Sequence, residues 1–254
     1  MRDQLTGGGE PGAGAPLEGL RGGVPPITPR DEVVALYTDM APRFDALLVD
    51  ELEYRIPEKL VVALDLVAPD RRFAHALDLG CGTGLTGALL RARCDVLEGV
   101  DVTPAMLDRA RARGVYDRLH QADLVEHLQE TAARPDLVVA TDVLIYVGDL
   151  EPVFAGARAV LAGGGLFAAS VERHDGVDVE RGPTGRYRHS RGYLERLAAD
   201  HDLAVLGFDP RAIRLEGGAF VPGWLFVLAA GAPPAARRGR AQRSRSDTPR
   251  PSGR

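Results

Sequence analysis

Lysine is almost missing from this sequence of 254 residues, because Lys59 stands alone against thirty arginines. A phosphate-binding P-loop needs a lysine directly after its glycines, and Schiff-base chemistry needs a lysine amine. Lys59 precedes the glycine-rich segment that begins at Gly80. We therefore expect neither nucleoside triphosphate chemistry nor a covalent lysine intermediate.

Cysteine and long apolar runs are scarce too. Cys81 and Cys94 are too few for a disulfide framework, which favours a reducing compartment. The cysteines and six histidines show no metal-ligand spacing. The N-terminus lacks an apolar signal core, and no apolar run approaches the ~20 residues of a membrane span. The sequence predicts a cytoplasmic protein with no metal and no membrane partner.

Charge is distributed unevenly. Residues 231–254 hold seven arginines and one aspartate, which leaves a net charge of −11 on residues 1–230. The negative charge of residues 1–230 favours a cationic ligand and disfavours nucleic-acid binding. Residues 231–254 have no aromatic side chains on which bases could stack. We expect a small-molecule substrate rather than a nucleic acid. No feature decides the number of subunits, and a monomer is the default expectation.

Composition divides the chain into three parts. Residues 1–28 are rich in glycine and proline and are predicted to be disordered, residues 29–230 form one domain, and residues 231–254 are a disordered arginine-rich tail. In the domain, strand and helix patterns alternate, which predicts an α/β fold with a parallel sheet covered on both faces. The last two strands, near 203–208 and 224–229, are expected to be antiparallel.

Residues 74–84 are the most informative segment. An apolar strand ends at Asp78 and breaks into a loop with three glycines, which lets a ligand approach the backbone. Twenty-one residues after Gly80, a second apolar run ends at Asp101, where a βαβ unit places an acid that accepts both ribose hydroxyls. The pattern predicts a nucleoside-binding half-site.

The spacing of the glycines narrows the choice of nucleoside that this half-site could bind. A dinucleotide fingerprint needs a glycine three residues after Gly82, but Leu85 stands there and the third glycine comes early, at Gly84. The nicotinamide interpretation is weakened accordingly.

The segment Asp78-Leu-Gly-Cys-Gly-Thr-Gly84 with a downstream acid resembles the class I S-adenosylmethionine-dependent methyltransferases, over residues 37–228. The resemblance implies a Rossmann-like, seven-stranded, mostly parallel sheet with an antiparallel last strand, and S-adenosylmethionine as cofactor. It also implies that Asp78 and the glycine loop hold the methionyl part, Asp101 the ribose and Asp123 the adenine amine. The predicted cofactor-binding residues are Tyr37, Asp78, Gly80, Cys81, Gly82, Asp101, Val102, Met106, Asp123, Leu124 and Thr141.

Within that family, the segments 37–45, 142–150 and 185–190 are similar to a bacterial group related to the predicted TPR-repeat methyltransferases. No TPR repeat is visible in this sequence, so the likeness concerns the methyltransferase half only.

Several of these residues have simpler explanations. Strand-terminating aspartates also cap helices and form turns, and this alternative is strongest for Asp123. Met106 and Leu124 could face adenine or belong to the core. Tyr37 and Phe44 lie on helical spacing that Pro42 interrupts, and they could form a lid or pack on the sheet.

Two helix starts are also predicted. Thr103 should cap the helix that begins at Pro104 and ends near Gly114, and Ser190 should cap a helix that reaches Ala199.

Methyl transfer is an in-line displacement that needs alignment, exclusion of water and, for a weakly acidic acceptor, a base. The candidates follow the fourth and fifth strands, and we list them as His189, Tyr187, Asp142 and Tyr146. The leading hypothesis makes His189 the base, and the alternative is a solvated or structural histidine. The arginines at 186, 188 and 191 could bind an anionic acceptor, although they could also reflect composition.

We conclude from the sequence that this is an S-adenosylmethionine-dependent methyltransferase acting on an oxygen or nitrogen of a small metabolite, anionic metabolites included. A protein or nucleic-acid methyltransferase is the second interpretation, but Thr141-Asp142-Val143-Leu144 stands where such enzymes would have an Asn-Pro-Pro-aromatic tetrapeptide. The third is a non-catalytic scaffold that binds the cofactor.

Overall fold

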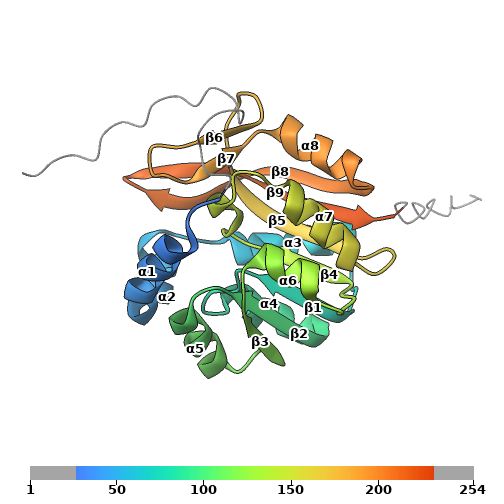
Figure 1. Ribbon diagram of the computed structural model, residues 1–254, viewed down its shortest axis with the longest axis horizontal. Helices are drawn as coiled ribbons and strands as arrows, with labels where there is room; N and C mark the ends of the chain where they lie inside the picture. Colours follow the sequence, from blue (N-terminus) through green and yellow to red (C-terminus); the bar gives the residue numbers. More distant parts are fainter. Residues whose placement is uncertain (1–26, 232–254) are drawn as a thin grey trace, which may run out of the picture.

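The structure is a computed structural model and describes residues 27–231. One nine-stranded sheet carries helices on both faces (Figure 1). The strands are β1 (Phe73–Leu79), β2 (Cys94–Asp101), β3 (Arg118–Gln121), β4 (Leu137–Ala140), β5 (Leu166–Arg173), β6 (Val179–Arg181), β7 (Tyr187–His189), β8 (Leu203–Glu216) and β9 (Ala219–Ala230). The longer helices are α1 (Arg30–Met40), α3 (Ile56–Val67), α4 (Leu85–Leu90), α5 (Pro104–Arg113), α6 (Leu124–Glu130), α7 (Glu151–Val160) and α8 (Arg191–Asp200). The short turns are η1 (Ala41–Arg43), α2 (Phe44–Ala46), η2 (Leu47–Glu51), η3 (Arg91–Arg93) and η4 (Leu144–Tyr146).

The sheet topology confirms the predicted fold class. Strands β3, β2, β1, β4 and β5 lie side by side in that order and are all parallel, while β9 is antiparallel to both β5 and β8. The strand order reverses between β1 and β4, which is the place where open α/β sheets bind ligands. The core architecture is therefore Rossmann-like with an antiparallel last strand, as expected.

Two strands exceed the predicted seven. β6 and β7 form a small antiparallel hairpin, and β7 pairs with the end of β5 at Glu172 and Arg173. Each of the two strands has only three residues, and charged side chains interrupt any apolar alternation. Sequence patterns of that length carry no strand signal, so the sequence does not predict this hairpin.

The core lies on both sides of the sheet. One cluster packs under α6, α7 and α8 and includes Leu128, Phe154 and Leu197, and the other packs under α3 and α4 and includes Leu60 and Leu90. All four residues of β4 are buried. A strand covered on both faces needs a continuous apolar run, which explains the Leu-Val-Val-Ala sequence.

The helix caps agree with prediction at one N-terminus and differ at the other. Ser190 Oγ accepts a hydrogen bond of 3.2 Å from the Tyr193 amide, as expected. Thr103 occupies the N-cap position before Pro104, as predicted, but its hydroxyl makes no capping bond, and Asp101 Oδ1 accepts the Thr103 amide at 2.8 Å. Gly114, with φ +71°, ends α5 as predicted.

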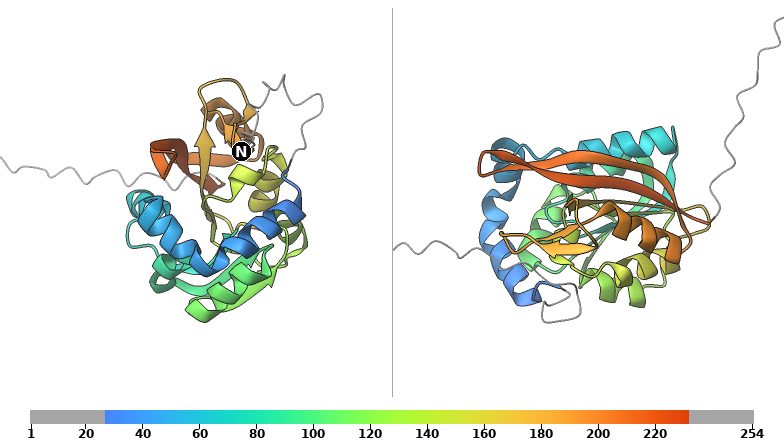
Figure 2. Two further views of the ribbon diagram at one scale, coloured as in Figure 1. Left: turned by 90° about the vertical axis from the view of Figure 1, so that its left-hand side faces the viewer. Right: turned by 90° about the horizontal axis from the view of Figure 1, so that it is seen from above.

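Residues 30–51, which we call the lid, comprise α1, η1, α2 and η2 and break at Pro42 as predicted. The lid lies near α5 and the carboxyl ends of the central strands (Figures 1 and 2). The carboxylate of Asp45 accepts hydrogen bonds from the Thr83 hydroxyl and from Arg113. These contacts attach the lid to the glycine loop.

The residues just before the lid correct one predicted boundary. Ile27 pairs with Val147, and the Thr28 amide donates to Tyr146 O at 2.8 Å, so the last two residues of the segment predicted as disordered are ordered. The rest of that segment and residues 232–254 lie outside the described residues.

The β8–β9 hairpin is longer than the predicted 203–208 and 224–229 and extends beyond the sheet core (Figure 2). At its far end the Leu215 amide donates to Leu52 O at 2.6 Å, directly after the lid. The hairpin thereby brings residues from the end of the domain to the edge of the sheet that the lid covers.

Candidate functional site

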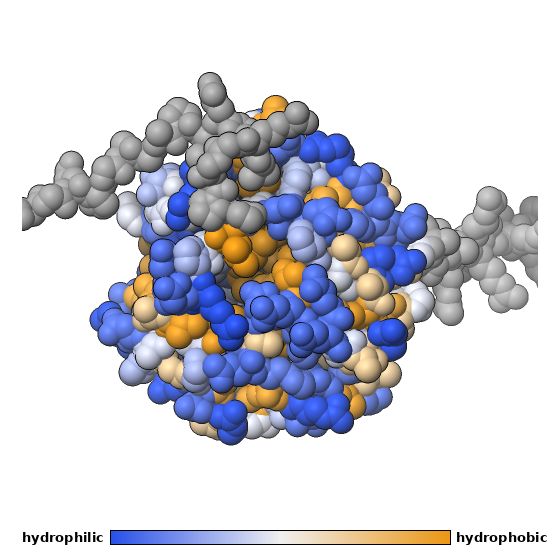
Figure 3. All heavy atoms as spheres, in the orientation of Figure 1, coloured by the Kyte–Doolittle hydropathy of each residue, from blue (hydrophilic) through white to orange (hydrophobic). Residues whose placement is uncertain are grey.

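A cavity of about 570 Å³ lies between the lid and the carboxyl ends of the central strands. Its volume is within the 300–1,000 Å³ range of small-molecule sites. Figure 3 shows apolar residues around a hollow in the middle of this face. The lining includes residues of the glycine loop, of the turns after β2, β3 and β4, and of the lid. The fold therefore gathers most of the predicted site residues around one space.

The glycine loop leaves its backbone open to the cavity at Gly82. The φ angles of Gly80 and Gly82 are +65° and +53°, in the left-handed region that favours glycine. A Cβ on Gly80 would lie 2.3 Å from Val143 Cγ2, whereas a Cβ on Gly82 would meet only the Phe44 ring, at 3.9 Å. Gly80 is thus required by packing and Gly82 by conformation, and the space over Gly82 is available to a ligand.

Asp101 is the acid at the wall of this space. Its Oδ2 accepts the Gly82 amide at 2.9 Å and its Oδ1 accepts the Thr103 amide at 2.8 Å. Burial raises the pKa of Asp101, and the backbone hydrogen bonds oppose that rise. The carboxylate holds the glycine loop against β2, and it lines the cavity beside Val102, as a ribose-binding acid would need to.

Asp78 does not line the cavity, which corrects the expectation of direct ligand contact. It is fully buried beneath the loop, where Oδ2 accepts the Tyr116 hydroxyl at 2.7 Å and Oδ1 has no partner among the described residues. Burial raises the pKa of Asp78 to about 7. Cys81, by contrast, does line the cavity, and burial raises the pKa of its thiol, so it is not a reactive thiolate.

Met106 and Leu124 also line the cavity and are almost fully buried, so they serve the core and the site together. Asp123 caps α6, because its Oδ1 accepts the amides of Val125 at 2.8 Å and Glu126 at 3.2 Å. The simpler explanation for Asp123 is therefore present in the structure. The residue also lines the cavity, so contact with an adenine amine stays a prediction.

Hydroxyl groups surround the far end of the cavity. The hydroxyls of Tyr37 and Tyr146 are 2.7 Å apart, and so are those of Thr86 and Thr141. Burial raises the pKa of Tyr37 well above its usual value, which keeps this phenol protonated. Tyr37 comes from the lid, so the pair with Tyr146 joins the lid to the turn after β4.

Asp142 is the carboxylate at this end. Its φ of +54° is unusual for a residue with a side chain, and its amide donates to Ser170 Oγ at 3.0 Å. The carboxylate accepts from Arg214 Nη1 at 3.0 and 3.3 Å. Burial raises the pKa of Asp142 to about 6, against the lowering effect of Arg214. Asp142 is thus ionised at neutral pH and remains able to accept a proton.

Arg214 is the functional residue that sequence reasoning missed. It lines the cavity from β8, 72 residues along the chain from Asp142. Arg214 falls between the two predicted strands, 203–208 and 224–229, and nothing in a single sequence indicates which acid an arginine will meet. The alternation of strand residues could have placed it on one face only after the hairpin's full length was known.

His189 and Tyr187 are not at the cavity, which corrects two of the four base candidates. The His189 ring is 0% exposed, its Nε2–H donates to the carbonyls of Val147 and Gly148 at 3.0 and 3.2 Å, and burial lowers its pKa to about 4. Tyr187 is also buried. Because β7 is a strand, these alternate residues point inward on the same side.

The predicted arginine cluster does not converge either. Arg186 lines the cavity and bonds Glu216 through Nη1 at 2.8 and 2.9 Å. Arg188 bonds Glu180 at 3.2 Å, and Arg191 bonds Glu195 at 2.7 Å on the exposed side of α8. Only Arg186 of the three is available to a ligand in this cavity.

Within residues 27–231, no helix combines the length and apolar character needed to cross a membrane. The same part of the chain contains no group of three or more histidine, cysteine or acidic side chains placed to hold a metal ion.

Comparisons with known proteins address the domain as a whole. A family model described as a methyltransferase domain matches residues 77–167. A trans-aconitate 2-methyltransferase of Paracidovorax citrulli is 36% identical over 97 residues, which cover 37% of each chain. A malonyl-[acyl-carrier protein] O-methyltransferase of Enterobacter lignolyticus is 27% identical over 186 residues, covering 72% of this chain and 71% of that relative. The matched segment spans well under half of the first of these relatives.

Solved structures share the fold at low identity. A 1,6-didemethyltoxoflavin-N1-methyltransferase of Burkholderia thailandensis, solved with S-adenosylhomocysteine, has a TM-score of 0.61 at 18% identity and covers 86% of this chain and 95% of its own. The [4+2]-cyclase SpnF has a TM-score of 0.63 at 16% identity, covering 84% of this chain and all of its own. At these identities the likeness concerns the fold alone.

Proposed function

We propose that this chain, which carries a class I S-adenosylmethionine-dependent methyltransferase domain, transfers the methyl group of that cofactor to an oxygen or nitrogen of a small, anionic metabolite. The observation that carries the proposal is the single cavity with an open glycine loop and Asp101 at one end and Asp142, Arg186 and Arg214 at the other. As part of the same proposal, we infer from the similar segments 37–45, 142–150 and 185–190 that the chain is related to the TPR-repeat methyltransferase group.

The residues present fit the cofactor. Gly82 offers an uncovered backbone, Asp101 offers carboxylate oxygens at the cavity wall, and Met106 and Leu124 offer apolar surfaces for a purine ring. When bound, the cofactor supplies an electrophilic methyl group on a positively charged sulfur. Asp123 completes this half of the site as the predicted partner of the adenine amine.

The other half of the cavity fits a small acceptor. The lid and the pair formed by Tyr37 and Tyr146 cover it, so water is restricted and a large macromolecular substrate would have to displace the lid. Asp142 provides a hydrogen-bond acceptor for an O–H or N–H group. These residues orient the acceptor and can take its proton.

Arg186 favours an anionic acceptor. Within residues 27–231 both of its hydrogen bonds to Glu216 use Nη1, so Nη2 and Nε can donate to a ligand carboxylate or phosphate in the cavity. The names of the two relatives, trans-aconitate and malonyl-[acyl-carrier protein] methyltransferase, also point to acidic acceptors. The acceptor class is therefore proposed from one cavity residue and from the relatives together.

The test separates cofactor binding from turnover. Calorimetric titration of S-adenosylhomocysteine and of NADH into the full chain should show binding of the first only. Release of S-adenosylhomocysteine from S-adenosylmethionine is then measured with a panel of di- and tricarboxylic acids, phenols and amines. Turnover with an acid supports the proposal, whereas binding without turnover on any panel member would favour the scaffold interpretation. Binding of NADH would overturn the assignment.

A further inference from the structure

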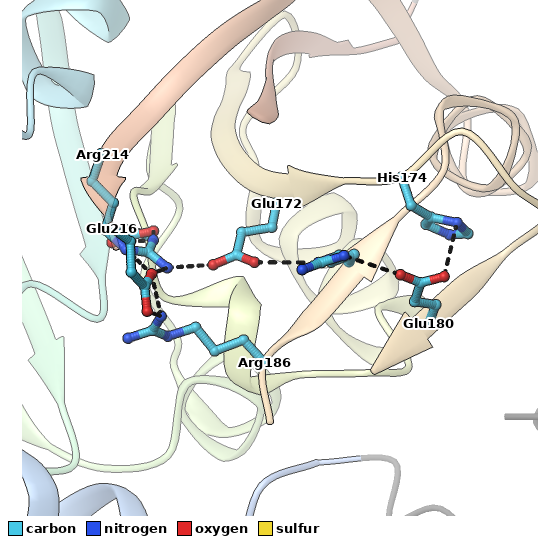
Figure 4. Close-up of polar contacts among 8 residues, drawn as sticks. Glu172, His174, Glu180, Arg186, Arg214 and Glu216 are labelled. Carbon is cyan, nitrogen blue, oxygen red and sulfur yellow. Dashed lines mark hydrogen bonds and ion pairs between the residues drawn. The ribbon is translucent and has the colours of Figure 1, made fainter. Parts of the chain in front are cut away.

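A buried ion-pair cluster surrounds Asp142, and methyl transfer by itself does not require it. Arg214, only 2% exposed, bonds Asp142 through Nη1, Glu172 through Nη2, and Glu216 through Nε at 3.2 Å and Nη2 at 3.0 Å. Figure 4 shows Glu172 and Glu216 converging on Arg214, with Arg186 on the outer side of Glu216. One guanidinium thus serves three carboxylates.

Such a cluster is a costly way to stabilise a fold. Removing several charges from water carries a large desolvation cost, and well-packed apolar residues are often as stabilising as a buried ion pair. A second costly feature coincides with it, because a non-glycine residue held at positive φ, as Asp142 is, stores backbone strain. Both features act on the same side chain, and that side chain faces the cavity.

We propose that Arg214 is a positioning residue that holds the Asp142 carboxylate ionised and directed into the cavity, so that Asp142 takes the proton of an O–H or N–H methyl acceptor. The inference rests on the proposed function. It implies that the nucleophilic oxygen or nitrogen of the acceptor carries a hydrogen. The acceptor proton moves to an Asp142 carboxylate oxygen. The acceptor lone pair forms the bond to the methyl carbon as the carbon–sulfur bond breaks. The electron pair of the broken carbon–sulfur bond leaves with sulfur.

Groups from every surrounding element act on Asp142. Arg214 and Arg186 favour the charged carboxylate, while Glu172 on β5, Glu216 on β8 and the burial of the site oppose it. The phenols of Tyr37, Tyr54 and Tyr146 line the same cavity, and burial raises the pKa of Tyr37 and of Tyr54 well above the usual value. Among these neighbours Arg214 contacts both carboxylate oxygens of Asp142, through Nη1. Its Nη2 and Nε bind Glu172 and Glu216 at the same time, and a lysine, with one nitrogen, has no such set of separate donors.

The direct test is the titration of the Asp142 carboxyl carbon by NMR in protein labelled with ¹³C-aspartate, with Asp142→Asn used for assignment. Wild type should titrate near pH 6. Arg214→Gln should raise the pKa of Asp142 by about 1 or more, because it removes an opposite charge in contact. Glu172→Gln should lower it, because it removes a like charge while keeping Arg214.

Arg188→Gln is the matched control. Arg188 approaches the same Glu172 carboxylate, at 3.8 Å, but does not touch Asp142. It should move the pKa of Asp142 far less than Arg214→Gln does. If Arg214→Gln fails to fold, Glu172→Gln decides the matter, and an unchanged or raised pKa in that variant overturns the proposal. Equal shifts in the Arg188 and Arg214 variants overturn it as well.

The NMR readout needs neither cofactor nor acceptor, so its failure is distinguishable from failure of the proposed function. With an acceptor identified, the acid limb of kcat should move to higher pH in Arg214→Lys and to lower pH in Glu172→Gln. A uniform loss of rate with an unmoved limb would show that Arg214 has a structural role only.

Discussion

At the scale of single residues, the site depends on four aspartates that differ in the hydrogen-bond donors around their carboxylates. Asp101 accepts two backbone amides, Asp123 caps a helix, Asp142 meets an arginine, and Asp78 is buried with one unpartnered oxygen. The same residue type at four strand ends therefore serves four purposes. Which purpose applies is decided by the donors that the fold brings to each carboxylate.

Asp101→Ala should weaken binding of S-adenosylhomocysteine at least tenfold, about 1.4 kcal/mol. The reason is twofold, because the variant loses a carboxylate at the cavity wall and releases the Gly82 amide. Calorimetry measures the change. Asp136→Ala is the control, since Asp136 also accepts two strand amides, those of Ala74 and His75, but outside the cavity. Similar losses in both variants would show that stability alone is responsible.

The buried His189 should make the stability of the fold depend on pH. Its folded pKa of about 4 lies below the ordinary value, so the unfolded chain takes up a proton between pH 7 and pH 5 that the folded chain refuses. The free energy of unfolding of wild type should fall by about 2 kcal/mol between pH 7 and pH 5 because of this group, and that of His189→Gln should not. Urea unfolding at both pH values measures this. The destabilisation caused by His189→Gln should shrink at pH 5, and a constant difference would contradict the buried, neutral histidine.

At the scale of elements, the lid is attached on two sides. Asp45 joins it to the glycine loop through Thr83 and to α5 through Arg113, and the Tyr37 hydroxyl joins it to Tyr146 in the turn after β4. The lid thus contacts both the proposed cofactor half and the proposed acceptor half. Its opening must break contacts in each.

Asp45→Ala should speed release of S-adenosylhomocysteine by about tenfold, because lid contacts act mainly on the dissociation rate. Stopped-flow displacement measures the rate, and faster amide exchange over residues 30–51 should accompany it. Asp39→Ala on the exposed side of α1 is the control and should leave both unchanged. A tenfold effect in both variants, or in neither, would reject the attachment through Asp45.

At the scale of the whole molecule, segments distant in the sequence meet around one cavity: the lid, the glycine loop, the turns after the parallel strands and the β8–β9 hairpin. The described part of the chain ends with β9 and Gly231, and residues 232–254 carry a net positive charge, opposite to that of residues 1–230. The chemistry of the site should therefore be independent of the tail.

Deletion of residues 232–254 should leave the affinity for S-adenosylhomocysteine within about twofold, since described residues line the cavity and salt screens the effect of distant charges. Calorimetry at 20 and 150 mM salt measures this. Replacing the seven tail arginines with glutamine separates the effect of charge from that of length. A loss of binding on deletion that salt does not alter would show that the tail belongs to the site.

The sequence alone determined the fold class, the glycine loop and the acid at the end of β2, because strand, loop and helix patterns are local and their spacing is short. It also located Asp142, Tyr146 and Thr141 at the end of β4. The tertiary structure decided how each side chain is used. His189 turns inward because its segment joins the sheet as β7, and Arg214 reaches Asp142 because a long hairpin folds back over the sheet edge. Such meetings depend on non-local packing, which no local pattern encodes.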